Sequence, residues 1–293
     1  MKTDEKQIEA VLADVRGVVA DCLRETSLRS IADELAGVAA SGKMLRVRIL
    51  FRVGAVHGVS MDNLKRIAAA VEMLHAASLL HDDVIDEAVL RRGIPSFWVT
   101  KGASGSILLG DLLVCKAFKL ISGVGAGRLA SVFVDLASEM CEAETEQELL
   151  FKGKTPDWST CVSIARRKTG ALFAFSAYAA GGNNSELSTA LMNAGYAAGT
   201  AYQLADDILD AYGDQGLAGK TLGGDAASRK ITAASSWRVS NVDPHVVIGN
   251  LLADSEKILL AWPDAAGAWS TYLKEDLVPV IDSFLGSFPV QTI

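Results

Sequence analysis

The chain has 293 residues, with 28 lysines and arginines against 35 aspartates and glutamates, and its formal net charge is −7. Half of the residues are apolar, which supplies a sizeable core and excludes the disordered and collagen-like classes. A net-acidic chain has no general attraction for nucleic acid, so a polyanionic ligand would need a local basic site or bridging divalent cations. We therefore expect no nucleic-acid partner.

The cysteine spacing and the hydropathy indicate the compartment. The four cysteines form no C-x-x-C pair and are widely separated, at Cys22, Cys115, Cys141 and Cys161, as is typical of reduced thiols in a cytoplasm. The first residues lack the apolar stretch of a signal peptide. The most apolar run, residues 170–182, is far shorter than the roughly 20 residues that cross a bilayer. We expect a cytoplasmic protein with no integral membrane segment.

Proline is rare along the chain, with six in total and none before Pro95. Apolar residues return every three or four positions, as in Leu45, Ile49, Leu50 and Val53, which predicts helices. Breaks between helices are expected, in chain order, at residues 40–42, 92–95, 123–127, 153–156, 181–185 and 213–224. The last break is rich in glycine and is expected to be a mobile loop. No break is long enough to separate domains, so we predict one all-α domain over residues 1–293.

Two segments repeat one pattern of carboxylates. They are His81-Asp82-Asp83-Val84-Ile85-Asp86 and Ala205-Asp206-Asp207-Ile208-Leu209-Asp210. Residues four apart lie on one face of a helix, so each run makes an edge of two carboxylates. A solvated acidic face would not need the apolar neighbours that surround both runs. Clustered carboxylates at the ends of buried helices repel one another unless cations separate them, and hard oxygen ligands favour Mg²⁺ or Mn²⁺. Two such edges across a cavity could hold several Mg²⁺ ions around a diphosphate.

Basic residues stand near both acidic runs, and a substrate with two phosphates needs such donors as well as metals. Arg91 and Arg92 follow the first run just before Gly93, where a helix can end. Lys43 and Arg46 flank an expected helix start after Gly42. Lys168 lies on an otherwise apolar helix, and Gln203 lies one turn before Asp206. Each of these alone is more often a solvated side chain than a ligand.

The quoted runs carry a family resemblance. Residues 72–93 and 202–210 resemble the first and second aspartate-rich motifs of trans-isoprenyl diphosphate synthases, the polyprenyl synthetase family. Supporting matches are Gly42-Lys43-x-x-Arg46, Leu109-Gly110-Asp111, Lys168-Thr169-Gly170 and Gly219-Lys220, in the order of the family. The resemblance implies a helical bundle of the isoprenoid synthase type around a central cavity, a homodimer, and a prenyltransferase that condenses an allylic diphosphate with isopentenyl diphosphate.

The resemblance also implies residue roles. Asp82, Asp86 and Asp206 would be the metal ligands and would hold three Mg²⁺ ions, for which Mn²⁺ could substitute. Asp83, Asp207 and Asp210 would complete the coordination shells of these ions through water or hydrogen bonds. Arg91, Lys168 and Lys220 would neutralise the allylic diphosphate. Lys43, Arg46, His75 and Arg92 would hold isopentenyl diphosphate, and Thr169 and Gln203 would stabilise the carbocation. The usual Gly-Lys-Arg-x-Arg-Pro pattern loses an arginine and the proline here, at Met44 and Val47.

Product length depends in this family on the residues four and five positions before the first aspartate, where bulky side chains stop chain growth. Here they are Ser78 and Ala77. Both are small, so we expect products of twenty carbons or more, medium to long, with a geranylgeranyl or farnesyl diphosphate synthase as the alternative. Another possibility is that these residues only permit close helix packing and that Leu74, Val71 or another helix supplies the floor.

Three other functions share some of these features. A class I terpene cyclase or head-to-head synthase shares the helices and Mg²⁺, but cyclases replace the second aspartate motif with an Asn/Ser/Glu set. A metal-dependent phosphohydrolase built on His81 and Asp82 would want further histidines, yet His57, His75 and His245 have no metal-ligand spacing. The non-catalytic regulatory subunit of a hetero-oligomeric prenyl synthase loses motif aspartates, whereas all six are present here.

Overall fold

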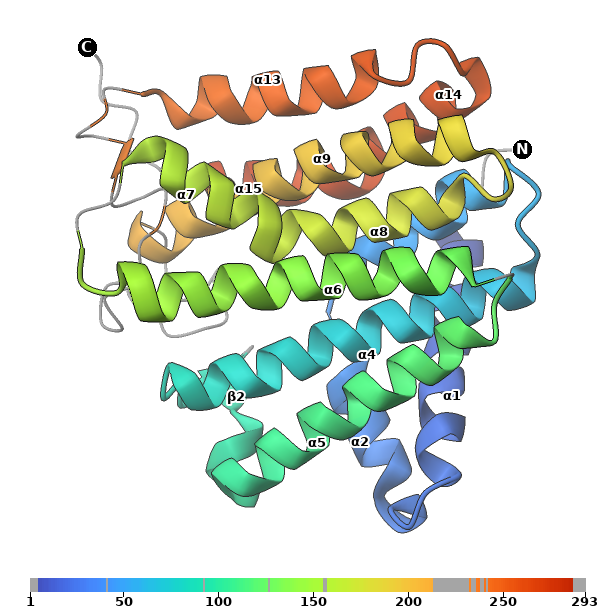
Figure 1. Cartoon of the computed structure of the whole chain (residues 1–293), viewed down its shortest axis with the longest axis vertical. Coiled ribbons are helices and arrows are strands. Elements are labelled where there is room, and N and C mark those ends of the chain that lie inside the picture. Colours follow the sequence, from blue (N-terminus) through green and yellow to red (C-terminus); the bar gives the residue numbers. More distant parts are fainter. Residues whose placement is uncertain are drawn as a thin grey trace.

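A computed structural model of the chain describes residues 5–40, 42–91, 93–125, 127–154, 157–212, 232, 236–237, 240 and 242–286. The long elements lie side by side in layers, with α6, α8 and α9 stacked between the pair α4 and α5 on one side and α13 on the other (Figure 1). The prediction of an all-α fold is confirmed.

The N-terminal half is made of these elements: α1 (Glu5–Arg24), η1 (Arg29–Ile31), α2 (Ala32–Ala39), α3 (Leu45–Ile49), η2 (Leu50–Gly54), α4 (Met61–Ile85), β1 (Leu90–Arg91), β2 (Ile94–Pro95), α5 (Phe97–Ser122), α6 (Arg128–Glu146) and η3 (Gln147–Phe151). The C-terminal half contains α7 (Trp158–Ala165), η4 (Arg166–Gly170), α8 (Ala171–Ala180), α9 (Ser185–Tyr212), α13 (Pro244–Lys257), α14 (Pro263–Tyr272), η5 (Leu273–Leu277) and α15 (Val278–Leu285). The segments η2, η3, η4 and η5 are π-helical.

The predicted breaks up to residue 185 coincide with helix boundaries, and residues 213–224 lie outside the described part of the chain. The break after the first acidic run contains a two-stranded antiparallel hairpin that the sequence analysis did not predict, with Leu90 opposite Pro95 and Arg91 opposite Ile94. Gly93 has a φ of 77°, which suits the tight turn between the strands. Arg91 therefore lies on a strand beyond the end of α4.

Helix α8 holds the bundle together. All ten of its residues are buried. One of its faces, including Leu172 and Phe175, packs into the cluster formed with α1, α2, α4, α5 and α6, and the other, including Phe173 and Ala177, packs into the cluster formed with α9, α13, α14 and α15. A helix that is apolar all round must be covered on every side. The described elements therefore form a single domain, whose bounds of 1–293 stay a prediction.

Glycines let α9 approach η4 and α8 closely. A Cβ atom added at Gly199 would lie 2.8 Å from Cα of Gly170, and one added at Gly195 would lie 2.7 Å from Cα of Ala174. Both contacts are with backbone, which cannot move aside as a side chain can. Glycine at these two positions thus allows α9, which carries Asp206, to lie close to the segment that carries Lys168.

Hydropathy along the described helices agrees with this packing. None of these helices combines the length and the apolar character needed to cross a membrane. The apolar run at residues 170–182 is instead mostly α8, which is covered by its neighbours.

Candidate functional site

A cavity of about 630 Å³ opens between α3, α4, α6, η4, α9 and α15. Acidic and basic side chains share its wall. The carboxylates that line it are those of Glu72, Asp82, Asp86, Glu144 and Asp206, and the basic side chains are those of Lys43, Arg46, His75, His81, Arg91 and Lys168. The N-terminal α4 and the C-terminal α9 therefore contribute to one charged site.

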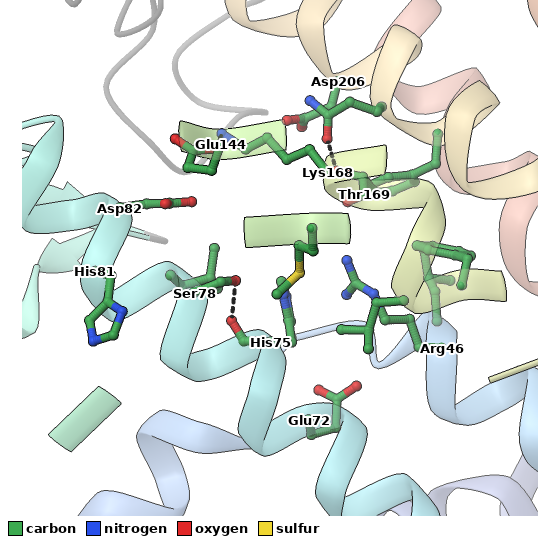
Figure 2. A pocket seen from close by; sticks show the side chains of 18 of the residues that line it. Arg46, Glu72, His75, Ser78, His81, Asp82, Glu144, Lys168, Thr169 and Asp206 are labelled. Atoms are coloured by element: carbon green, nitrogen blue, oxygen red, sulfur yellow. Dashed lines mark hydrogen bonds and ion pairs between the residues drawn. The ribbon is translucent and has the colours of Figure 1, made fainter. Parts of the chain in front are cut away.

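The six motif aspartates divide into two groups. Asp82 on α4, Asp86 at the C-cap of the same helix and Asp206 on α9 are half-buried and line the cavity. Figure 2 shows Asp82 and Asp206 projecting into it from the two helices. The other three, Asp83, Asp207 and Asp210, are at least nine-tenths buried and do not line it. The three that line the cavity are those that the sequence analysis proposed as metal ligands.

Asp83 is bound by a cation of the chain itself. Arg91 Nε donates a 2.7 Å hydrogen bond to its Oδ1. Burial raises the pKa of Asp83, the bond and charge of Arg91 lower it, and Asp86 raises it a little further. Arg91 lines the cavity while it holds Asp83, so in this structure it is not fully available to a substrate diphosphate.

Carboxylate oxygens are the ligands that Mg²⁺ prefers, and Mg²⁺ commonly uses only one or two of them together with water and substrate phosphates. Among the described residues, no three His, Cys, Asp or Glu side chains come close enough to hold a metal ion by themselves. The three aspartates lie on two walls of one cavity instead. This donor set fits divalent ions that are shared with a bound diphosphate, and does not fit a closed site made of protein ligands alone.

A hydrogen-bonded chain connects η4 to the second motif. Thr169 Oγ1 donates to Oε1 of Gln203 at 2.6 Å, and Nε2 of Gln203 donates to Oδ1 of Asp207 at 2.6 Å. Thr169 and Gln203, which the sequence analysis assigned to the carbocation, thus meet at the cavity wall. Because Asp207 accepts from Gln203, it serves to orient this amide.

The basic residues proposed for isopentenyl diphosphate gather near α3 and α15. Lys43 Nζ lies 4.8 Å from the ring centroid of Phe284, and Arg46 Cζ lies 4.9 Å from that of Phe173. Burial lowers the pKa of Lys43, and the charge of Asp206 opposes this shift. His75 lines the cavity one turn from Ser78. Arg92 and Lys220 lie outside the described residues.

The two chain-length positions have different surroundings. Ser78 lines the cavity, and its Oγ donates to the carbonyl oxygen of His75 at 2.8 Å. Ala77 has no exposed surface, belongs to the core around α4 and α5, and is not part of the cavity wall. Close packing of Ala77, which the sequence analysis left open as an alternative, matches its position, whereas Ser78 can meet a ligand.

Several wall residues were not found from the sequence. Glu72 is 1% exposed, and it lies on the cavity side of α4 ten residues before Asp82, close to three helical turns, so its position in the helix was a usable signal. Glu144 and Cys141 come from α6, and Phe284 from α15, both far from either aspartate run. No local pattern marks these residues, because only helix packing brings them to the cavity.

His81 is directed toward α5. Its Nε2 lies 3.1 Å from the carbonyl oxygen of Ile107 and 3.5 Å from Oδ1 of Asp111, and Figure 2 shows the ring pointing away from Asp82. A Cβ atom at Gly110 would lie 2.3 Å from the same nitrogen, so glycine makes room for this ring. The arrangement gives no support to a phosphohydrolase centre built on His81 and Asp82.

Sequence comparison identifies relatives with related names. The chain is 32% identical to the octaprenyl diphosphate synthase of Haemophilus influenzae, over 64% of this chain and 58% of that protein. It is 30% identical to the short chain isoprenyl diphosphate synthase of Methanothermobacter thermautotrophicus, over 84% of this chain and 78% of that protein. The match to the Haemophilus protein thus spans less than two thirds of its length, and the two names differ in product length.

Structure comparison gives the same family. The polyprenyl synthase of Caulobacter crescentus CB15, solved with calcium and isoprenyl diphosphate, matches with a TM-score of 0.73 and 28% identity, over 98% of this chain and 91% of that chain. The family model described as polyprenyl synthetase matches residues 26–257, which is well over half of the chain. With its helical fold and with aspartates of both runs lining one cavity, the chain belongs to the polyprenyl synthetase family of prenyltransferases.

Proposed function

We propose that this protein condenses an allylic diphosphate with isopentenyl diphosphate in a Mg²⁺-dependent reaction. The observation that carries the proposal is that Asp82 and Asp86, at the C-terminal end of α4, share one cavity with Asp206 on α9 and with two lysines and two arginines. A cavity that is both strongly acidic and basic suits a polyanionic substrate that arrives with divalent cations. The Caulobacter relative, solved with calcium and isoprenyl diphosphate, supports this assignment.

In the proposed site, Asp82, Asp86 and Asp206 would hold three Mg²⁺ ions, for which Mn²⁺ could substitute. The bound ions would neutralise charge on the diphosphate leaving group. Asp83, Asp207 and Asp210 are too buried to touch these ions directly and would act through Arg91, Gln203 and the helices that carry them. Lys168, with Lys220 from outside the described residues, would add positive charge on the same diphosphate.

Isopentenyl diphosphate would bind at the side of the cavity formed by Lys43, Arg46 and His75, with Arg92 as a further ligand. The departures at Met44 and Val47 leave this side with two described cations. Met44 has a φ of 47°, in the left-handed region, where it forms the turn that leads into α3. Lys43 and Arg46 therefore flank this turn, and both of them line the cavity.

Aromatic rings between the two sides would protect the cationic intermediate. The centroids of Phe173 and Tyr202 lie 5.7 Å apart, those of Tyr202 and Phe284 lie 5.6 Å apart, and all three residues line the cavity. Such rings stabilise positive charge through their faces and exclude water. Thr169 and Gln203 would add oxygen dipoles at the same wall. The isopentenyl double bond then attacks the cation, and the departed diphosphate accepts the proton that is lost.

We propose a medium- to long-chain all-trans product of twenty carbons or more, because the cavity wall at Ser78 carries a small side chain. Geranylgeranyl or farnesyl diphosphate is the alternative product. Relatives of similar identity bear names of both kinds, octaprenyl and short chain. Chain length therefore has to be measured directly.

We also propose a homodimer in the cytoplasm. Large apolar side chains are exposed on α5, α6 and the following η3, among them Leu108 at 66%, Val134 at 50% and Leu149 at 75%. Burial of such a surface stabilises subunit association. All four cysteines are free thiols, which fits a reducing compartment.

The test is incubation of the purified protein with isopentenyl diphosphate, Mg²⁺ and allylic primers of increasing length, followed by sizing of the dephosphorylated alcohols. We expect elongated alcohols that disappear when Mg²⁺ is chelated. Absence of product with every primer would contradict the proposal and favour the regulatory-subunit alternative. A cyclic hydrocarbon formed without isopentenyl diphosphate would favour a cyclase.

A further inference from the structure

Three consecutive basic residues of η4 pair with three acids of α6. Arg166 NH1 lies 3.3 Å from Oε1 of Glu139, and Arg167 NH2 lies 2.5 Å from Oε2 of Glu146. Lys168 Nζ forms an ion pair with Glu144. Three ion pairs between the same two segments fix the position of η4 along α6, because a shift of η4 would break all three.

The ion pair between Lys168 and Glu144 differs from the others in its position. Lys168 and Glu144 both line the cavity, whereas Arg167 and Glu146 do not. The side chains of Lys168 and Glu144 are 23% and 18% exposed, compared with 24% and 31% for Arg167 and Glu146. The two ion pairs thus resemble each other in chemistry and burial, but only Lys168–Glu144 lines the cavity.

A second acceptor completes the surroundings of Lys168. Its Nζ donates to Oε1 of Gln147 at 3.3 Å, and Gln147 is 4% exposed. Glu144 and Gln147 are three residues apart, so they lie on one face where α6 passes into η3. An ammonium group has three N–H donors. Lys168 donates one hydrogen bond to Gln147 and is ion-paired with Glu144, and the ammonium group has further N–H donors for a ligand in the cavity.

Glu144 also lies close to the first aspartate motif. Burial is the main cause that raises the pKa of the Cys141 thiol, which lines the same wall, and the nearby charges of Asp82 and Glu144 raise it further. Figure 2 shows Lys168 extending across the top of the cavity to Glu144, on the side where Asp82 projects. The ammonium group is therefore held beside the carboxylates that would bind the metal ions of the diphosphate.

From this geometry we propose that Glu144 is a positioning residue, which with Gln147 holds Lys168 where its ammonium group meets the allylic diphosphate. The inference rests on the proposed function and adds to it a residue that neither aspartate motif contains. A fixed ammonium group acts on the leaving diphosphate at the correct distance, whereas a free lysine samples many rotamers.

The test compares Glu144→Gln with the matched control Glu146→Gln, which breaks the ion pair between Glu146 and Arg167 outside the cavity. We expect E144Q to lower kcat by about tenfold or more, with the KM for isopentenyl diphosphate changed less than about twofold. Thermal unfolding of the two variants should be similar, and E146Q should keep the wild-type kinetics. In a Lys168→Met background, E144Q should cause little further loss, because its effect passes through Lys168.

A binding measurement gives a readout that does not require turnover. Titration calorimetry with inorganic pyrophosphate and Mg²⁺ should show weaker binding to E144Q than to E146Q. If Glu144 were only a competitor for Lys168, removal of its charge would instead tighten pyrophosphate binding, and that result would overturn the proposal.

Two further outcomes are separable. Equal kinetics of E144Q and E146Q in an active wild-type background would overturn this inference alone, whereas an inactive wild type would overturn the proposed function. Should E144Q not fold, Glu144→Asp takes its place. The shorter carboxylate withdraws from the ammonium group, so the same loss of kcat is expected, and parity with Glu146→Asp overturns the proposal.

Discussion

Arg91, on strand β1, and Asp83, in the last turns of α4, form an ion pair in which Nε of the arginine donates to Oδ1 of the aspartate at 2.7 Å. The carboxylate side chain is 3% exposed, and the guanidinium side chain is 34% exposed at the cavity edge. The middle aspartate of the first motif thus fixes the hairpin that follows α4. A buried carboxylate needs such a partner, because burial raises its pKa and disfavours its charge.

This pair gives a pH-dependent prediction. Since the pKa of Asp83 is raised in the native state, the protonated form favours folding, and its contribution to stability is lost as the pH rises through the native pKa. Arg91→Leu removes the groups that lower this pKa, so its destabilisation should grow between about pH 4 and 7. At neutral pH we expect a loss of about 1–3 kcal/mol in the free energy of unfolding. The Arg91→Leu/Asp83→Asn double variant should lose this pH dependence, and denaturant unfolding at several pH values would reveal any that remains.

Removal of the carboxylates that line the cavity should abolish turnover without unfolding the protein. Asp82→Ala and Asp206→Ala each delete an oxygen ligand from one wall, so we expect kcat to fall by at least about two orders of magnitude. Circular dichroism should show helical content close to the wild type. Asp254→Ala, an exposed aspartate of α13, is the control and should leave turnover unchanged. A near-normal rate for Asp82→Ala would refute the assignment of this residue to the metal.

Product length should respond to Ser78 rather than to Ala77. Ser78→Phe places a ring in the cavity wall, so the allylic chain would meet an obstacle sooner and the alcohols would be shorter. Ala77→Phe adds the same ring inside the packed core of α4 and α5, where overpacking typically costs about 1–3 kcal/mol. Chromatographic sizing and thermal unfolding measure the two effects. Shortening by Ala77→Phe at unchanged stability would place the floor behind α4 instead.

The lowered pKa of Lys43 should affect substrate binding at alkaline pH. Burial makes this ammonium lose its proton at a lower pH than an ordinary lysine, so affinity for isopentenyl diphosphate should weaken as the pH rises from about 8 to 10. Lys43→Arg should keep binding over this range because a guanidinium stays protonated. Calorimetric titration without divalent metal measures this affinity. Identical profiles for the two proteins would show that the charge of Lys43 does not determine it.

The close approach of α9 to η4 should depend on Gly199. A methyl group there meets Cα of Gly170 at 2.8 Å, so Gly199→Ala must push two backbones apart, and we expect a loss of about 1–3 kcal/mol together with lower turnover. Gly249→Ala on α13 meets no atom within 4 Å and serves as the control, with neutral or slightly raised stability. Equal stability of the two variants would mean that the helices can separate without cost.

The sequence by itself determined the helical class and the helix breaks at residues 40–42, 92–95, 123–127, 153–156 and 181–185, and it indicated a metal-binding role for the two aspartate runs. These features are local. A period of three to four residues, a glycine after an acidic run and a spacing of four between carboxylates can each be recognised within one or two turns. The same local spacing indicated that Asp82 and Asp86 share a helix face, and both of them line the cavity.

Only the tertiary structure decided which of these side chains meet. Helix packing brings Glu144 to Lys168 and Phe284 to Lys43, across 24 and 241 residues of chain, and no local pattern records such contacts. The packing also buries Asp83 with Arg91 and directs His81 toward α5. The physical reason is that a local pattern shows which residues share a helix face, whereas the partner of that face is set by how the whole core excludes water.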